Sequence, residues 1–495
     1  MLKWRVQTWA LVVVLALAVP AAWAQQQKDP RLNPPVAPLP PLSLGESSSK
    51  ASLDDPAANP QNAVKPDESP LSGAEAFSLG TKGGGRSFVT PTIRFTQLGD
   101  NNKRSATSLA DWRTAGTLTG QLALQHIKAR SQLGIDYSAG GTLYSTTSSY
   151  RSSFHRLGLS EQISFRRWTL LLADSFTFLP ESSFGSGGLG GISTGLPGGM
   201  GNGGIGTGLG GFGGGFGGGI IPGITPNQSI LTDIGRRVSN TVLGQIQYTI
   251  SPRASMTASG TYGLLRFLDS GFIDSNNYQF MSGYNYKMTA ADTIGVVYTL
   301  SMMRFGGINR SADIHSIHLA YGRRLTGRLA LRLSGGPRVN SFENPLSGSK
   351  NSVSWGLRSS LLYNFRNTDL GLNYSHGATT GSGVVVGADT DRVEGTITRQ
   401  LTRMWNGGLV FGFAHNQSIR QLNTVATNLT VNTWHTGFRL QRPVSRQASL
   451  TFSYNLTGQT ANTPTGCTGL ACGRMPLRHQ FALGFTWGFG PYEID

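Results

Sequence analysis

Along most of the chain, apolar side chains recur at every second position. The pattern begins near Arg86 and continues almost to the C-terminus. In residues 447–457, one face carries only hydroxyl and amide groups and the other only apolar residues, namely Ala448, Leu450, Phe452, Tyr454 and Leu456. Successive side chains of a β-strand point to opposite faces, so this period of two predicts strands with one apolar and one polar face.

The lengths of these segments and of their connections indicate a membrane barrel. Each segment runs for roughly 10 to 14 residues, long for a soluble strand and enough to cross a bilayer at a tilt. A soluble sandwich or propeller, the alternative, would use shorter strands. Outer-membrane barrels keep short turns in the periplasm and long loops outside. Long loops here alternate with short turns at 128–131, 166–167, 251–253, 289–292, 326–328, 366–368, 402–404 and 444–446.

The turns also give the number of strands. The hairpins around them supply about 16 strands, and residues 476–489 add one more. An even number with both ends in the periplasm requires a further strand, which residues 87–97 supply although Pro91 is unusual inside a strand. The predicted fold class is an all-β, antiparallel transmembrane β-barrel of about 18 strands, a size that encloses an aqueous channel.

Two segments precede the barrel. Residues 1–24 combine Lys3 and Arg5, a short apolar core and the small-residue site Ala22-Trp23-Ala24, which is typical of a secretory signal peptide. Residues 25–85 are rich in Pro and Ser and poor in apolar residues, so we expect a disordered periplasmic linker. The barrel occupies 86–495, and the expected location is the bacterial cell outer membrane.

Composition fits a barrel and gives the sign of its charge. Mean hydropathy is −0.16, which a barrel tolerates because only alternate residues face lipid. The formal net charge is +17. No clustered basic helix or base-stacking motif accompanies that charge, so the partners it favours are anionic solutes or lipid headgroups, and no nucleic acid is expected.

The polar face of the strands lines the predicted interior. Its expected basic residues are Arg156, Lys287, Arg324, Arg332, Arg358, Arg439 and Arg478, and its expected acidic residues are Asp136 and Glu394. A basic wall stabilises an anion that has lost part of its hydration shell, which favours anionic solutes. The alternative is that these arginines bind carboxylates and only hold the barrel together.

Two external segments stand out by composition. The loop 180–236 is very rich in glycine, which favours disorder, although it could also fold into the pore or bind a surface partner. Its matches to nucleotide-binding glycine patterns lack a framing strand and helix. Cys467 and Cys472 lie close together in an oxidising compartment, so we expect a small-loop disulfide and no metal site.

Two carboxylates conflict with the strand pattern. Glu161 and Asp174 have the parity of the lipid-facing residues, where a charge is costly at mid-membrane. A slip in the assumed register is the favoured explanation, and contact with another subunit or with the Gly-rich loop is the alternative.

The sequence gives no sign of catalysis. The eight histidines are scattered, and neither a nucleophile elbow nor a zinc-protease motif is present. We therefore expect no enzyme activity, although a triad assembled from distant strands would escape this test.

The last strand carries the most specific local feature. Gly484, Trp487 and Phe489 match the glycine and aromatic spacing of the signal that the barrel-assembly machinery binds. On these residues, the chain resembles bacterial outer-membrane β-barrels of the porin-like class over 86–495. Ala482 replaces the usual polar residue, and the chain continues past its last aromatic strand residue to Asp495. The resemblance implies insertion from the periplasm and no cofactor, and it leaves a homotrimer open.

The expected function is an outer-membrane channel for diffusion of small hydrophilic, preferentially anionic solutes. Two alternatives remain at this point. One is an export pore for an acidic polysaccharide, and the other is a structural or adhesive surface barrel.

Overall fold

The computed structural model describes twelve stretches of the chain: 87–101, 112–145, 151–179, 236–269, 272–306, 310–344, 348–365, 367–379, 387–418, 430–445, 447–462 and 475–494. The expected signal peptide, linker and disulfide, and nearly all of the Gly-rich loop, lie outside these residues. No helix in the described stretches is long and apolar enough to cross a membrane.

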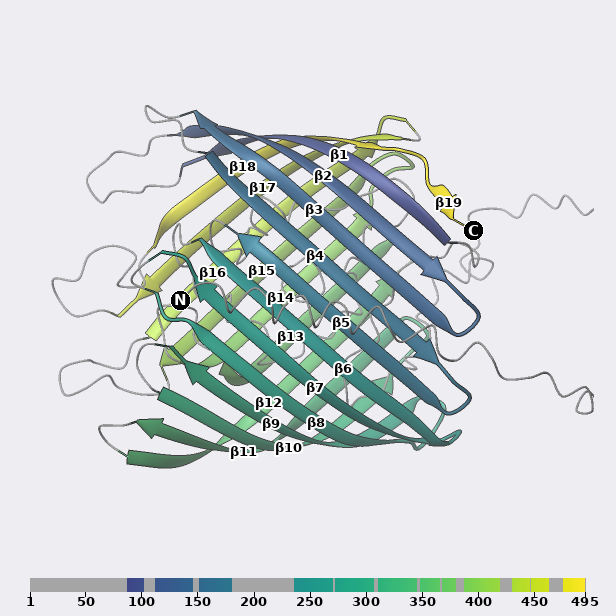
Figure 1. The fold of residues 1–495 in the computed structure, drawn as a ribbon, viewed down its shortest axis with the longest axis vertical. Helices are drawn as coiled ribbons and strands as arrows, with labels where there is room; N and C mark the ends of the chain where they lie inside the picture. Colours follow the sequence, from purple (N-terminus) through teal and green to yellow (C-terminus); the bar gives the residue numbers. More distant parts are fainter. Residues whose placement is uncertain are drawn as a thin grey trace, which may run out of the picture. The chain divides into compact units, whose positions relative to one another are not determined.

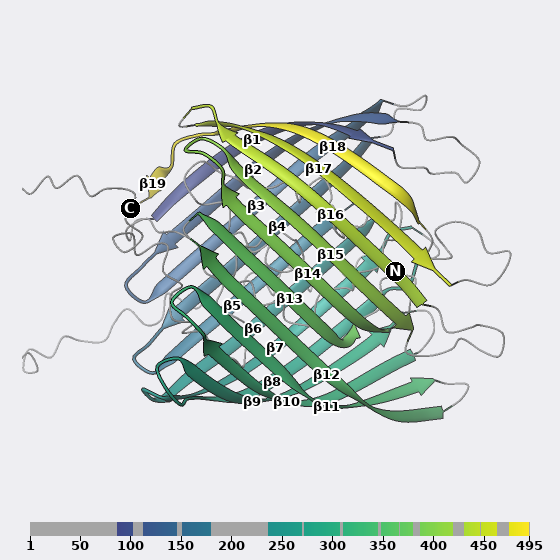
Figure 2. The same cartoon turned by 180° about the vertical axis from the view of Figure 1, so that it is seen from behind.

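The described strands form one closed antiparallel barrel (Figures 1 and 2). Each strand pairs with the next along the chain, and β1 pairs with β18 to close the ladder. The predicted barrel of about 18 strands is confirmed. The strands are β1 (Ser87–Asp100), β2 (Arg113–Ile127), β3 (Ser131–Ser145), β4 (Arg151–Ser164), β5 (Trp168–Leu179), β6 (Arg237–Ser251), β7 (Ala254–Phe267), β8 (Ser275–Lys287), β9 (Asp292–Phe305), β10 (Arg310–Arg324), β11 (Leu329–Asn344), β12 (Gly348–Phe365), β13 (Thr368–Thr379), β14 (Ala388–Gln400), β15 (Asn406–Ser418), β16 (Thr430–Pro443), β17 (Ala448–Ala461), β18 (Met475–Gly488) and the short β19 (Tyr492–Ile494).

Hydroxyl side chains close several of the short turns. Thr289 Oγ1 accepts hydrogen bonds from the backbone N–H groups of Ala291 and Asp292, at 3.1 and 2.9 Å. Thr402 and Ser445 accept equivalent backbone N–H bonds in two other turns. Such bonds satisfy backbone donors locally, which stabilises a tight connection. The short turns join β2 to β3, β4 to β5 and every second strand pair after that, so in an antiparallel ring they all lie at one end. We assign this end to the periplasm.

The two faces of the wall have opposite chemistry. Large apolar side chains point outward and stay exposed, as Phe95, Leu118 and Phe280 do at half or more of their surface. Threonine, serine and glutamine side chains point inward and are buried, for example Thr96 and Gln245. A water-soluble barrel would have the reverse distribution, so the outer surface is the surface that contacts lipid.

The pairing of β1 accommodates both Pro91 and the residues that follow the last spanning strand, β18. The ladder between β1 and β18 begins at Thr92–Gly488, and β19 pairs with Ser87–Val89. Pro91 lies between these two ladders, where the missing N–H leaves no gap in strand pairing. The C-terminal residues that depart from the assembly signal thus extend the sheet beside β1.

The register-slip explanation for Glu161 and Asp174 is wrong. The ladders that join β3 to β4, β4 to β5 and β5 to β6 run without a shift. Glu161 lies opposite Leu133 and Leu172, and Asp174 lies opposite Val242, so both carboxylates face outward. Their presence on the lipid side needs a physical reason, which is given below.

Candidate functional site

The candidate site is the inner wall of the barrel. Strand register and the outward direction of the apolar residues place all of the expected interior residues on the inward face. Lys287 and Arg324 lie at the periplasmic ends of β8 and β10. Four further arginines also point inward and were missed in the sequence: Arg94, Arg237, Arg338 and Arg392. Arg94 was detectable, because its neighbours Ile93 and Phe95 are apolar and outward.

Near the outer mouth, inward arginines bind carboxylates. Arg478 on β18 donates from Nε and Nη2 to the two carboxylate oxygens of Asp100 on β1, at 3.0 and 2.6 Å. The two side chains are only 8% and 1% exposed. Such a bidentate, buried pair fixes both geometry and charge. This pair therefore ties the first strand to the last, at the seam where the barrel closes.

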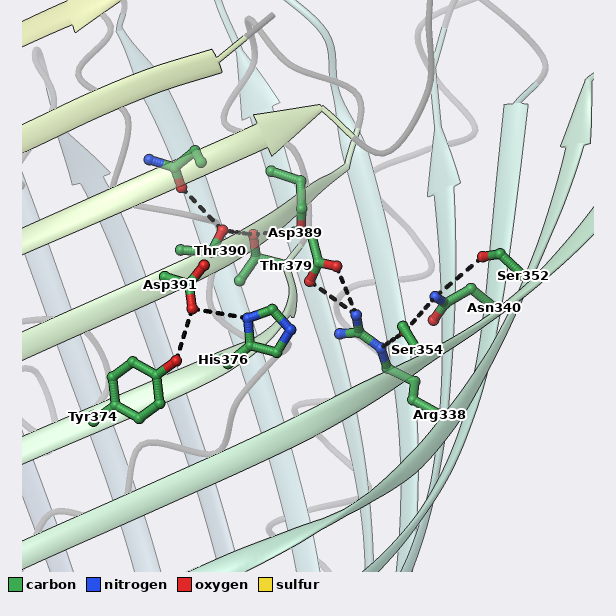
Figure 3. Close-up of polar contacts among 12 residues, drawn as sticks. Arg338, Asn340, Ser352, Ser354, Tyr374, His376, Thr379, Asp389, Thr390 and Asp391 are labelled. Carbon is green, nitrogen blue, oxygen red and sulfur yellow. Dashed lines mark hydrogen bonds and ion pairs between the residues drawn. The ribbon is translucent and has the colours of Figure 1, made fainter. Parts of the chain in front are cut away.

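A second pair joins strands that are not neighbours. Arg338 on β11 donates from Nη2 to both carboxylate oxygens of Asp389 on β14, at 2.8 and 2.9 Å (Figure 3). Its Nε donates to Ser354 on β12 at 2.8 Å. Three strand spacings of about 4.8 Å would separate β11 from β14 in a regular sheet, which is more than these side chains can bridge. The outer end of β14 must therefore approach β11 across the inner wall.

The strand pairing explains this approach. The ladder between β12 and β13 extends outward only to Leu357–His376, although β12 continues to Gly348. Beyond that point the β13–β14 hairpin leaves β12, and a Cβ added to Gly377 would be 3.6 Å from Nη1 of Arg338. Ala378 packs against an inward-facing apolar cluster of Met303, Phe305, Ala312 and Ile314. The outer ends of β13 and β14 (residues 377–379 and 388–390), which we call the hairpin tip, thus lie over the inner wall of β9–β11.

Hydroxyl and amide groups support the inward tip. Thr379 and Thr390 pair across the hairpin at 2.9 Å, and Thr390 donates to Asn416 on β15 at 2.9 Å (Figure 3). On the β11 side, the Asn340 amide donates to Ser354 at 2.9 Å. The threonine contacts join the hairpin to β15, and the Asn340–Ser354 bond orders the β11–β12 surface that carries Arg338.

Deeper in the barrel, two of the expected arginines have no carboxylate partner. Arg358 on β12 makes no hydrogen bond or ion pair with any described residue. Arg439 on β16 donates only to the Gln441 amide, at 3.2 Å, and its Nε is buried without a partner among the described residues. These two side chains therefore present uncompensated positive charge to the interior.

Polar groups without partners surround these charges. Ser449, Thr451 and Ser453 on β17 have buried hydroxyls with no hydrogen-bond partner in the described part of the chain. Ser453 lies directly opposite Arg439. Near Arg358, His318 is buried and its Nε2 has no partner among the described residues, and Gly356 leaves room for that ring. Both arginines thus lie among unused hydrogen-bonding groups.

The expected acids are largely engaged. Glu394 contacts the guanidinium of Arg392. Asp136 accepts a 2.7 Å hydrogen bond from Gln121 and lies within electrostatic range of Arg156. Outside the spanning strands, hydrogen bonds from Arg236 lower the pKa of Asp269 at the outer rim. The remaining charge in the interior is therefore positive.

The described residues contain no cluster that suggests catalysis or metal binding. His376 Nδ1 lies 2.9 Å from Asp391, but no hydroxyl or thiol contacts its other ring nitrogen among the described residues. No three potential metal-ligating side chains converge in the same stretches.

Comparisons with known proteins give a likeness of fold. No protein-family model and no curated protein matches the chain. It is similar to the crystal structure of Pseudomonas aeruginosa OpdQ, with 12% identity and a TM-score of 0.40 over 82% of this chain and 99% of that chain. For Acinetobacter baumannii OccAB3 the values are 11%, 0.39, 81% and 99%. For the outer membrane protein opdK from Pseudomonas aeruginosa they are 8%, 0.38, 81% and 99%.

The chain's own surface decides its class. Its exterior is apolar, its interior is polar, and β1 to β18 form an uninterrupted ring. Only a closed barrel of this kind satisfies every strand hydrogen bond within lipid. The chain is therefore a porin-like β-barrel of the bacterial outer membrane.

Proposed function

We propose that the barrel is a channel through which small hydrophilic solutes diffuse, and that it favours anions. The observation that carries the proposal is the state of Arg358 and Arg439, which lie on the inner wall without a carboxylate partner among the described residues. The wall acids Asp100, Asp389 and Glu394 are engaged with other arginines.

The chemistry around Arg439 suits a partly dehydrated anion. A guanidinium group binds carboxylates and phosphates through paired N–H donors. The β17 hydroxyls beside it can replace water molecules that the anion loses. Ala482 and Gly484 on β18 are small, which keeps this part of the wall open. Expected solutes are therefore small carboxylates and phosphates.

The inward hairpin tip supports small solutes over polymers. It lies inside the wall near the outer mouth and is fixed by the Arg338–Asp389 ion pair and by apolar packing. A channel for an acidic polysaccharide would need this mouth to stay open for a long flexible chain. Diffusion of small anions is accordingly the preferred function, and polysaccharide export is second.

Planar-bilayer recording tests the proposal. The purified full chain should give ohmic conductance, and in a tenfold KCl gradient its reversal potential should have the sign of chloride permeation. Absence of conductance would reject a channel, and a cation-selective reversal potential would reject the anion preference. The export alternative would be favoured if an acidic polysaccharide blocked the chloride conductance at concentrations at which simple carboxylates do not block it.

The adhesive alternative has a separate test. Deletion of residues 185–219 should leave conductance and selectivity unchanged if the barrel is a channel with an independent surface loop. Loss of surface binding after this deletion would add an adhesive role for the loop.

A further inference from the structure

Three tyrosine–histidine pairs recur on the lipid-facing surface. Tyrosine hydroxyls lie 2.8 to 3.0 Å from histidine Nδ1 in every pair. The pairs are Tyr137 with His155, Tyr298 with His315, and Tyr454 with His479. They occupy β3–β4, β9–β10 and β17–β18, so they are distributed around the barrel and do not form one patch (Figures 1 and 2).

The three pairs lie at the same depth. Each tyrosine is the seventh residue of its strand, counted from the periplasmic turn. Each histidine lies opposite the residue that is two positions farther from the periplasmic turn than its tyrosine. These residues are Ala139, Leu300 and Leu456. Each histidine is the tenth residue of its own strand, counted from the periplasmic turn. At about 3.3 Å per residue and a tilt of about 40°, this places the histidines roughly 20 to 25 Å above the periplasmic turns, which is the outer border of a lipid-facing band of about 25 Å.

Two of the other outward polar pairs at this depth contain a carboxylate. Asp174 is the seventh residue of β5 and accepts a 2.7 Å hydrogen bond from Asn240. Tyr374 is the seventh residue of β13 and donates to Asp391 at 2.8 Å. Asp174 therefore lies at the polar border, where a carboxylate is inexpensive.

Glu161 has the corresponding position at the opposite border. It lies near the periplasmic end of β4 and accepts a 3.2 Å hydrogen bond from Ser131. The two carboxylates that conflict with strand parity thus mark the two edges of the lipid-facing band.

In each tyrosine–histidine pair, the second ring nitrogen of the histidine, Nε2, takes no part in the contact with tyrosine. When the tyrosine hydroxyl donates to Nδ1, Nε2 carries the hydrogen and is a donor, as it is in the imidazolium form. None of the three Nε2 atoms has a partner among the described residues or is enclosed by them. Each therefore offers a hydrogen-bond donor toward lipid headgroups.

We propose that His155, His315 and His479 bind the phosphate groups of outer-leaflet lipids. Phosphate is the strongest hydrogen-bond acceptor at headgroup depth, and a charge-assisted bond to it is stronger than one to an ester carbonyl. The Asp174–Asn240 pair presents a carboxylate, which accepts hydrogen bonds, where the other pairs present an imidazole donor. Phosphate is also an acceptor, so we expect no phosphate binding at that part of the border.

Native mass spectrometry of the full chain tests this proposal. The barrel is released from micelles that contain either phosphatidylglycerol or a phosphate-free galactolipid, and retained lipids are counted. Wild type should retain more phosphatidylglycerol than galactolipid. Each single variant His155→Phe, His315→Phe or His479→Phe should lose one retained phosphatidylglycerol, and the triple variant should lose all three.

His126→Phe is the matched control. This histidine is on the outward face at the periplasmic end of β2, where its Nδ1 lies 2.9 Å from Ser87. Its loss should not change lipid retention at the outer border. Heat-modifiable electrophoretic mobility verifies folding of every variant. Equal retention of phosphatidylglycerol by wild type and by the folded single variants would overturn the proposal.

Discussion

The outer mouth and the middle of the channel use inward arginines in different ways. At the mouth, Arg478 and Arg338 each bind a carboxylate in a bidentate arrangement. Farther toward the periplasm, Arg358 and Arg439 have only neutral partners or none among the described residues. The same side chain on the same face thus serves as a structural tie in one region and as a source of positive potential in the other.

This difference teaches that a count of basic residues does not give the field inside a pore. The formal charge of +17 includes arginines whose charge is compensated within a few ångströms. Coulomb energy falls with distance and with solvent screening, so a compensated pair contributes little to a passing ion. Selectivity should therefore depend on a few unpaired arginines and stability on the paired ones.

The largest expected effect is on stability, from Asp100→Asn. The substitution leaves the buried Arg478 guanidinium without its counter-charge, which costs about 3–5 kcal/mol when a buried pair is broken. Urea unfolding in lipid vesicles, followed by tryptophan fluorescence, measures the free energy of unfolding. Arg439→Gln is the control, with an expected change below about 1 kcal/mol because no ion pair is lost. Equal destabilisation by both variants would remove the distinction between the two regions.

The next effect is on conductance, from Asp389→Asn. Arg338 is buried but Asp389 is about one-third exposed, so we expect a cost of about 1–3 kcal/mol. Without the ion pair the hairpin tip is held less firmly at the mouth, and single-channel conductance should rise. Thr379→Val alters the same tip without touching the ion pair and should change conductance less. An unchanged conductance in Asp389→Asn would show that the tip does not limit flow.

Much of the fold was predictable because the barrel uses a simple period. One face of every spanning strand must be apolar, and turn lengths differ between the two sides of the membrane. These two rules gave the orientation, the strand number and the inward position of residues such as Arg358. Proline in β1 was the main local conflict, and the break between β18 and β19 resolves it.

The partners of the charged residues were not predictable. The pair between Arg338 and Asp389 depends on the inward bend of a hairpin, and parity alone assigns Asp389 to the outward face. Residues 388–392 contain little apolar pattern that could indicate this bend. The tyrosine–histidine pairs likewise require the cross-strand register, because their members are 17 to 25 residues apart in the sequence.

The most direct test of the central claim is the reversal potential of the double variant Arg358→Gln/Arg439→Gln in a tenfold KCl gradient. Removal of two uncompensated charges, each contributing about 0.5–1 kcal/mol in a screened pore, should lower the anion-to-cation permeability ratio by at least about fivefold. Asp389→Asn, which leaves both charges in place, should keep the wild-type sign. An unchanged ratio in the double variant would contradict the account.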